Sequence, residues 1–469
     1  MEVLSLSMDL LEFAVEVGLS LGARFCEARY FEERINSISV ENGIAKALSS
    51  GILRGISVRV IASGHWGFAS TNVLTKESAE RTVRDAISGA KSISAYAIEE
   101  AQIANAKPSA DKVLHGVKIK PENIDPEIKV KKVLDLEKAA REFDNRVKDT
   151  LVAYRDIITR VIVHNSLGTL VEEITPRTII SCRVIAREGS FMQSGYEVLG
   201  NVAGYELIEE TSPENFSIKA AEKAVSLLSA KAPPRGKFSV VVDPKVGGLF
   251  VHEAIGHNSE GDLVYGGQSI MANKLGQKVA SELVTIIDDP SAKGYGRFTY
   301  DHEGVRAKPH LIIKDGVLVG FLHSLETAAK LGGEPEGSAR AQSHHYPPIV
   351  RMSNIYLAPR DMILEEIMED INYGLYLSGS EYGYVESEKG QFTCKVEEAW
   401  LIKRGELREH LRDVAISSLI FEALKNITAV GRDMRLEMPG MCGKSGQSIY
   451  VDGGAPHFRI DGIIVGGRS

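Results

Sequence analysis

Residues 250–262 read FVHEAIGHNSEGD, and the rest of the chain is best understood around this stretch. It places His252, Glu253 and His257 close together in an HExxxH spacing. Two imidazoles that bind an ion, beside a carboxylate that takes a proton from water, are what a hydrolytic zinc site needs. Our first hypothesis is therefore a metal-binding helix.

The spacing of the two histidines is unusual for such a site. In the common HExxH arrangement they are four positions apart, which is about 40° around a regular helix. His252 and His257 are five positions apart, which is about 140° on the same helix. A π-bulge or a break in the last turn would bring them back into line, and Gly256 tolerates such a distortion. The motif alone leaves two interpretations open: a distorted metal-binding helix, or a helix end that carries two unrelated histidines.

A second candidate ligand lies near the other end of the chain. In MPGMCGKSGQ, residues 438–447, Cys442 is flanked by glycines, and we expect a loop because the segment is too rich in glycine for a core helix or strand. Cysteine is usually a small buried hydrophobe. That explanation suffices for Cys26, Cys182 and Cys394, which lie in or after apolar runs. For Cys442 packing is a poor explanation, and metal binding is the alternative.

The two segments together resemble the TldD branch of the TldD/PmbA family of metallopeptidases, whose PmbA branch lacks the metal motif. Three further segments match the family: GISVRVIASGHWGFAST (Gly55–Thr71), VRMSNIYL (Val350–Leu357) and VEEAWLIKRGEL (Val396–Leu407). The resemblance covers nearly the whole chain. Because the HExxxH element is retained, the chain is similar to the TldD branch rather than to the PmbA branch.

The resemblance implies a role for each residue of the motif. It implies that His252 and His257 bind zinc, that Cys442 is the third protein ligand and that Glu253 is the general base. One zinc ion is expected per chain, with a fourth position left for water. The implied reaction is peptide hydrolysis, in which Glu253 takes the proton of the water and passes it to the leaving amine.

The resemblance also implies a substrate class and a partner. The implied substrates are unstructured peptides or unfolded proteins, drawn into a closed space between subunits. Main-chain pairing would hold them there, and such pairing gives little sequence preference. The implied partner is a second copy of the chain in a homodimer, or a metal-less PmbA-branch paralogue in a heterodimer.

Two other functions would use the same residues. One is a binding or regulatory scaffold with a structural zinc, and the other is a zinc amidohydrolase that acts on small amides. A structural zinc site is normally closed by a fourth protein ligand. No fourth Cys or His lies near either motif, which favours an enzyme.

Further residues are candidates for supporting the site. Glu260 and Asp262 can orient the ligand histidines through hydrogen bonds without binding the metal themselves. Glu260 is also an alternative to Cys442 as the third ligand. The segment 332–354 is rich in Gly, Ser and Pro, and a structureless loop of this length is usually a binding loop or a lid. Its candidates for stabilising a tetrahedral oxyanion are His344, His345, Tyr346 and Arg351. An ordinary polar surface loop is the alternative.

Composition limits the class of protein. A length of 469 residues suggests two domains, and a net charge of −8 gives no basic footprint for nucleic acid. No apolar run reaches the roughly 18 residues that a membrane span requires. The 4 cysteines have no paired spacing, so we expect a reducing compartment, the cytoplasm, rather than a disulfide framework.

The expected fold class is α+β, with antiparallel or mixed β-sheets packed by helices. We expect an N-terminal α+β domain over residues 1–230 and a C-terminal metal-binding peptidase domain over residues 237–469. The linker contains Pro233 and Pro234, which end a helix. A strand then opens the second domain, and Pro244 begins the metal helix.

Local patterns predict the elements of the first domain. Apolar spacing predicts an N-terminal helix, a second helix capped by Thr75 and a third that begins near Pro126. Between the first two helices we expect short strands at 28–31, 37–40, 56–62 and 66–70. More strands are expected between residues 150 and 196.

Two turns are predicted in the second domain. Asp315-Gly316 between apolar runs predicts a β-hairpin. Asp288-Asp289 precedes a proline, which favours a turn at a strand end over a metal site.

Overall fold

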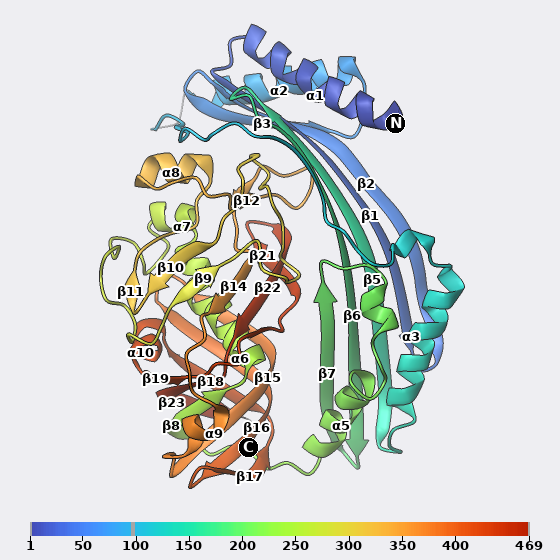
Figure 1. The fold of residues 1–469 in the computed structure, drawn as a ribbon, viewed down its shortest axis with the longest axis vertical. Helices are drawn as coiled ribbons and strands as arrows, with labels where there is room; N and C mark the ends of the chain where they lie inside the picture. Colours follow the sequence, from blue (N-terminus) through green and yellow to red (C-terminus); the bar gives the residue numbers. More distant parts are fainter. Residues whose placement is uncertain (1, 95–98, 468–469) are drawn as a thin grey trace.

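The computed structural model describes residues 2–94 and 99–467, which form two halves that lie side by side (Figure 1). The first half is a long curved sheet covered by helices, and the second half packs against the hollow side of that sheet. The mixture of sheets and helices confirms the α+β class. No helix among the described residues is long and apolar enough to cross a membrane.

One seven-stranded sheet spans the first half, in the order β3-β2-β1-β5-β6-β4, with β7 paired to β6. All of its strand pairs are antiparallel except β4–β6, which is parallel. The strands are β1 (Phe25–Glu41), β2 (Ile44–Ala62), β3 (His65–Thr71), β4 (Ala110–Leu114), β5 (Val147–Asn165), β6 (Leu170–Glu188) and β7 (Phe191–Asn201).

These strands are much longer than expected. β1 has 17 residues and runs through two of the predicted strands, 28–31 and 37–40. The expectation of short strands is wrong because the polar segment between them, residues 32–36, resembles a break in the sequence. In the structure this segment pairs with β2 on one side and β5 on the other, so its backbone groups are satisfied inside the sheet. The chain turns only at Asn42-Gly43, whose φ angles of 51° and 78° suit a two-residue hairpin.

Two groups of helices cover the sheet. α1 and α2 pack on one end of it in one buried apolar cluster, and α3 and α5 pack on the other end in a second cluster. As predicted, the side chain of Thr75 caps α2 by accepting a hydrogen bond from the N–H of Ser78, and Pro126 is the first residue of α3. The helices are α1 (Glu2–Ser20), α2 (Lys76–Ile93), η1 (Pro121–Asn123), α3 (Pro126–Arg141), α4 (Glu206–Glu209) and α5 (Ser217–Leu227).

The second half contains two more seven-stranded sheets and a short strand pair. The first has the order β15-β8-β23-β18-β16-β17, with β19 on β23, and the second has the order β11-β10-β9-β14-β22-β20, with β21 on β22. The strands of the first are β8 (Gly236–Val242), β15 (Tyr373–Glu386), β16 (Gln391–Lys403), β17 (Glu406–Leu411), β18 (Val414–Leu419), β19 (Ile427–Val430) and β23 (Phe458–Gly467). Those of the second are β9 (Ile286–Asp288), β10 (His310–Lys314), β11 (Val317–Leu318), β14 (Asn354–Leu357), β20 (Arg435–Leu436), β21 (Gly440–Lys444) and β22 (Gln447–Ala455). The short pair is β12 (Ala339–Arg340) and β13 (Ile349–Val350).

Both turns predicted in this half are present. Asp315 and Gly316 have φ angles of 45° and 82° and join β10 to β11. The side chain of Asp289 accepts a hydrogen bond from the backbone N–H two residues on, as in a turn. The buried carboxylate of Asp288 accepts from the N–H and the hydroxyl of Ser353. Asp288 and Asp289 therefore have a structural role.

Helix α6 (Pro244–Val251) lies in the core of the second half, and most of its residues are buried. Pro244 opens it as predicted, and the side chain of Asp243 caps it by accepting from an N–H of the first turn. A Cβ atom at Gly248 would lie 2.7 Å from the backbone of Gly453, so β22 runs directly against the helix. This contact fixes the position of α6, the helix that leads into the residues of the metal motif. The other helices here are α7 (Gly261–Tyr265), α8 (Leu325–Leu331), α9 (Leu364–Met368) and α10 (Ile420–Lys425).

The chain passes between the halves where the linker is expected. α5 ends at Leu227 and β8 begins at Gly236. The assignment of residues 1–230 and 237–469 as two domains stays a prediction.

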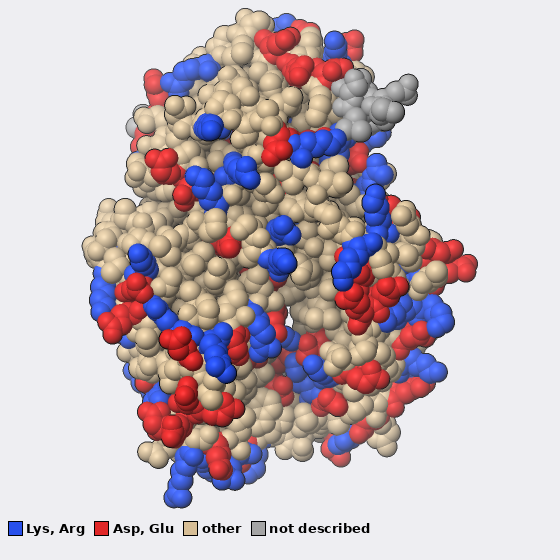
Figure 2. All heavy atoms as spheres, in the orientation of Figure 1, with Lys and Arg blue, Asp and Glu red and all other residues tan. Residues whose placement is uncertain are grey.

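Charged side chains of both signs are interspersed over the face shown in Figure 2. No region of that face is covered by Lys and Arg alone. This distribution agrees with the acidic net charge of −8.

Candidate metal centre

The metal motif lies where α6 changes its pitch. After Val251 the helix continues as a π-helical turn, η2 (His252–Gly256), in which the N–H of His257 donates to the carbonyl of His252. A 3-10 turn, η3 (His257–Ser259), follows. The wider turn brings the two imidazoles together, with ring centroids 5.2 Å apart and ring planes at 90°. The distortion expected from the histidine spacing is therefore present.

Gly256 is required in this turn because another core residue occupies the space beside it. A Cβ atom at position 256 would lie 1.8 Å from Sδ of Met352, which is fully buried. The φ angle of Gly256 is −54°, an ordinary helical value. The requirement for glycine is therefore one of packing.

Cys442 lies on β21, which pairs only with β22 among the described strands. The expectation of a loop in this segment is wrong, because glycine content does not distinguish a loop from a short edge strand. The tight turn is limited to Ser445-Gly446, with φ angles of 50° and 72°. Because β21 is regular, the position of the Cys442 side chain is set by strand pairing.

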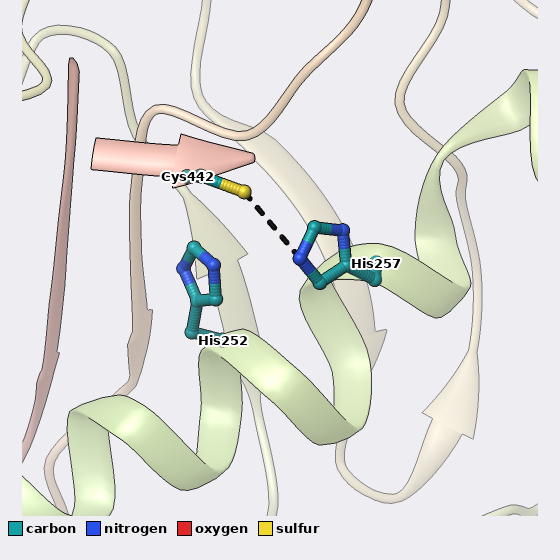
Figure 3. Close-up of side chains that lie close together, drawn as sticks. All are labelled: His252, His257 and Cys442. Atoms are coloured by element: carbon teal, nitrogen blue, oxygen red, sulfur yellow. Dashed lines mark hydrogen bonds between the residues drawn. The ribbon is translucent and has the colours of Figure 1, made fainter. Parts of the chain in front are cut away.

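Three side chains from the two motifs meet in space (Figure 3). Sγ of Cys442 lies 3.4 Å from Nε2 of His257, although the two residues are 185 positions apart in sequence. The ligand atoms of His252, His257 and Cys442 all lie within 4.8 Å of one another. His252 and Cys442 are only 5% and 4% exposed. The three residues can hold one metal ion in a largely enclosed site.

The protonation of Cys442 fits metal binding. Burial by itself would raise the pKa of its thiol, but the imidazoles of His252 and His257 beside it lower that pKa to about 4. The thiolate, which is the form that binds metals, is therefore the stable form. Nδ1 of His252 is also buried and has no hydrogen-bond partner among the described residues. These features suit a site built for a cation.

Glu260 supports His257 from the side opposite to Cys442. Its Oε2 lies 3.2 Å from Nδ1 of His257, where a neutral imidazole donates its proton, so Nε2 is left facing Cys442. Glu260 is fully buried and forms an ion pair with Lys444 at 3.1 Å, and Lys444 in turn binds Asp262 at 2.8 Å. Because Glu260 occupies the Nδ1 side, the geometry favours Cys442 over Glu260 as the third ligand.

Glu253 lies beside the three candidate ligands. It lines a pocket of about 370 Å³ together with His252, His257 and Cys442. Strand β15 forms another wall, where a Cβ atom at Gly383 would lie 2.8 Å from Cγ of Glu253. Sequence reasoning missed Gly383. A glycine inside a strand indicates close approach of another group, and that signal would have found it.

Of the four donors in the segment 332–354, Arg351 lies next to the candidate metal ligands. It is 1% exposed and donates to the backbone carbonyl of Cys442. Its Nε lies 4.0 Å from Oε1 of Glu260. Arg351 therefore ties β21 to the residues behind the site.

The other three donors lie elsewhere. His344 is fully buried against Gly55 of β2, in the first half of the chain. Arg29 of β1 donates to backbone carbonyls of this loop, including that of Tyr346. The described lining of the pocket at Glu253 contains neither His344, His345 nor Tyr346. This part of the loop joins the two halves of the chain.

The sequence matches three domains of one family. The matched descriptions are PmbA/TldA metallopeptidase domain 1 over residues 26–90, the central domain over residues 119–228 and the C-terminal domain over residues 235–467. Together they span both halves of the structure.

Individual relatives and structures agree with this match. The chain is 40% identical to a protein of Methanothermobacter thermautotrophicus named "Metalloprotease", over 94% of this chain and 95% of that one. It is 29% identical to the "Zinc metalloprotease TldD homolog" of Saccharolobus solfataricus, over 95% of this chain and 97% of that one. The crystal structure of TldE from Thermococcus kodakarensis has a TM-score of 0.79 at 19% identity, over 98% of this chain and 100% of that one, which shows a shared fold.

Proposed function

This chain belongs to the PmbA/TldD family of metallopeptidases, and on that premise we propose that it is a zinc-dependent peptidase that cleaves unstructured peptides and unfolded proteins. The observation that carries the proposal is the convergence of His252, His257 and Cys442, with Glu253 in the same pocket. These are two imidazoles, a thiolate and a carboxylate base, which is the donor set of a hydrolytic zinc site.

One zinc ion per chain suits the three ligands. Imidazole and thiolate both bind zinc well, and three protein ligands leave one position of a tetrahedral ion open. The relative from Saccharolobus solfataricus carries zinc in its name. When bound, zinc supplies a water of lowered pKa and polarises the scissile carbonyl.

The residues around the ion have separate roles. Glu253 is the general base, which takes the proton of the attacking water and passes it to the leaving amine. Glu260 holds the Nδ1 proton of His257 and so fixes the ring with Nε2 toward Cys442. Arg351 holds the strand of Cys442 by donating to its carbonyl.

Extended peptides suit this site because a free strand edge lies beside the pocket. β21 pairs with β22 on one side, and among the described strands its other edge has no partner. Met441, Cys442, Gly443 and Lys444 of β21 all line the pocket. An extended peptide can pair with such an edge through its main chain, which gives low sequence preference. A folded protein cannot present such a segment.

The proposal also covers the partner of the chain and its cellular compartment. We propose that the chain works as a homodimer or as a heterodimer with a metal-less PmbA-branch paralogue, in the cytoplasm. The four cysteines are unpaired in the structure, which supports a reducing compartment. The net charge of −8 argues against a nucleic-acid partner.

A scaffold with a structural zinc is the main alternative. Such a site is normally closed by a fourth protein ligand, whereas the cluster of described residues contains three. A zinc amidohydrolase for small amides would use the same residues, and the length of the cleaved substrate distinguishes it from a peptidase.

Two measurements test the proposal. Elemental analysis is expected to find one zinc per chain in the parent protein and in Glu260→Gln, and none in His257→Ala or Cys442→Ala. The zinc-loaded chain is expected to cut a globular protein after denaturation and to leave its folded form intact. Equal cleavage of both forms would contradict the substrate proposal. A zinc-loaded, folded chain that cuts neither peptides nor small amides would support the scaffold.

A further inference from the structure

A cavity of about 80 Å³, which we name the inter-half cavity, lies between the curved sheet and the second half of the chain. One of its walls comes from β1, β5 and β6 of that sheet. The other comes from β22, which faces the sheet in Figure 1, and from the segments that carry His302 and Arg340. Met441 of β21 lines both this cavity and the pocket at Glu253, so the two spaces are neighbours.

Two arginines that line the inter-half cavity carry charges without an ion-pair partner. Arg177 and Arg340 are only 5% and 3% exposed. Each donates to two backbone carbonyls, and neither forms an ion pair with another described residue. Nε of Arg340 is buried and has no hydrogen-bond partner among the described residues. Because a buried charge is costly unless it is paired, positive charge is left over at this cavity.

Neighbouring groups do not neutralise these charges. Glu173, one of two carboxylates in the lining, lies 2.6 Å from Nε2 of His115. Glu33, the other, accepts hydrogen bonds from two hydroxyls, and burial raises its pKa, which favours its neutral form. Burial lowers the pKa of Arg177 although both carboxylates are nearby. Arg177 and Arg340 each lie 4.8 Å from the centre of an aromatic ring, which attracts a cation without neutralising it.

His302, which also lines the cavity, adds a neutral hydrogen-bond donor. Burial, followed by the charges of arginines that include Arg340 and Arg177, holds the pKa of His302 well below its ordinary value. Nδ1 of His302 accepts a hydrogen bond from the backbone N–H of Ala341, so the proton of the neutral ring is on Nε2. The lining therefore combines two cations with a further donor, which is the setting that a carboxylate requires.

We propose that the inter-half cavity binds a carboxylate of the peptide substrate, either the side chain of an Asp or Glu residue or the C-terminal carboxylate. The inference rests on the proposed peptidase function, and it adds a preference at one residue position to pairing through the main chain. Guanidinium groups bind carboxylates through charge-assisted hydrogen bonds, which are stronger than neutral ones. A volume of about 80 Å³ holds several water molecules, and one acidic side chain can replace them.

The position of β21 explains how a peptide reaches the cavity. Side chains alternate along a strand, so Met441 lies on the face of β21 opposite to Cys442. An extended peptide that pairs with the free edge of β21 has its own side chains on alternate faces in the same way. A residue on the Met441 face then has the inter-half cavity within reach, while its neighbours lie beside Cys442 and Glu253.

Calorimetric titration of the zinc-loaded Glu253→Gln chain measures peptide binding apart from cleavage. The probes are blocked peptides in which each position in turn carries Glu or Gln, and one uncharged peptide with either a free or an amidated C-terminus. A side-chain subsite predicts one position at which Glu binds about 10- to 100-fold more tightly than Gln. A C-terminal subsite predicts the same factor between the free and the amidated peptide. The parent protein should then cut at a fixed distance from the preferred carboxylate.

A carboxylate built into the cavity tests the unpaired charge without any peptide. Ser448 lines the cavity and lies on the same face of β22 as Tyr450. Ser448→Asp should raise the melting midpoint by about 2 °C or more, because it gives the arginines a partner. It should also remove the preference for the peptide carboxylate. Ser194→Asp is the matched control, since Ser194 is exposed in β7 of the curved sheet, and it should change neither property.

Three results would overturn the inference. The first is equal binding of every Glu and Gln pair and of both C-terminal forms, which would leave the peptidase proposal intact. The second is a Ser448→Asp chain that keeps both the midpoint and the carboxylate preference of the parent, because the carboxylate would then bind elsewhere. The third is a chain that binds no peptide at all, which would contradict the peptidase proposal itself and with it the substrate role of the cavity.

Discussion

Replacing Gly256 by alanine tests whether packing against Met352 holds the π-helical turn that assembles the metal site. In an ordinary helix, glycine to alanine stabilises the fold by about 0.4–1 kcal/mol, because it reduces the freedom of the unfolded chain. Here the new Cβ would lie 1.8 Å from Sδ of Met352, which is fully buried. Overpacking of this kind costs about 1–3 kcal/mol or more. The cost of the clash exceeds the gain from the reduced freedom of the unfolded chain, so we expect net destabilisation.

Two assays measure the consequence. A loss of about 1–2 kcal/mol should lower the melting midpoint of the second half by several degrees, at about 2–4 °C per kcal/mol for a unit of this size. Because Met352 is fully buried, we expect the turn to shift away from its sulfur, which would carry His257 away from Cys442. Zinc content should therefore fall together with the midpoint.

The chain offers a matched control and a rescue. Gly89 lies in α2 with nothing within 4 Å of a Cβ built on it, so Gly89→Ala should keep or raise the midpoint. Met352→Ala removes the obstructing sulfur, and combined with Gly256→Ala it should show a favourable coupling of about 1–3 kcal/mol. The reasoning is refuted if Gly256→Ala keeps both the parent midpoint and one zinc per chain.

Three further predictions concern catalysis and pH. Glu253→Gln should keep its zinc and lose about 10²–10⁴-fold in kcat, as removal of a general base does; retained activity in peptide cleavage assays would assign the base elsewhere. Gly383→Ala should push Glu253 aside and lower kcat up to about 10²-fold at unchanged zinc content; zinc loss instead would show that β15 supports the ligands. Burial, followed by the charges of His345 and Arg29, lowers the pKa of His344 to about 4, so the unfolded chain binds this proton first as pH falls. Its contribution to stability is complete above about pH 6.5 and is lost as pH falls toward 4, so denaturant titrations should show a shallower decline in this window for His344→Gln than for the parent protein.

The candidate ligands of the metal centre could be selected from the sequence because the selection depends on residue type and local spacing. Because His252 and His257 are five positions apart, a π-bulge or a break in the last turn is needed if they are to share an ion, and Gly256 tolerates such a distortion. The structure contains the π-helical turn. The caps at Thr75 and the turn at Asp315-Gly316 are also local, because the hydrogen bonds and φ angles that define them lie within a few residues.

Predictions failed where distant partners decide the outcome. β1 stays a strand through residues 32–36 because β2 and β5 satisfy its backbone on both sides, which no local pattern shows. The glycines around Cys442 suggested a loop, yet pairing with β22 makes the segment a strand. In the segment 332–354, Arg351 lies beside the candidate metal ligands, and His344 packs against Gly55 in the first half of the chain.

By itself, the sequence determined which groups can bind a metal and which local distortion would bring two of them together. Only the tertiary structure decided that Cys442, 185 positions from His257, faces its Nε2 while Glu260 occupies its Nδ1 side. It also decided that, among the described strands, β3 covers the outer edge of β2 only from Ile56 to Ala62. The physical reason is that residue type and spacing fix local geometry, whereas contacts between distant residues depend on how whole sheets pack and on which backbone groups that packing leaves unpaired.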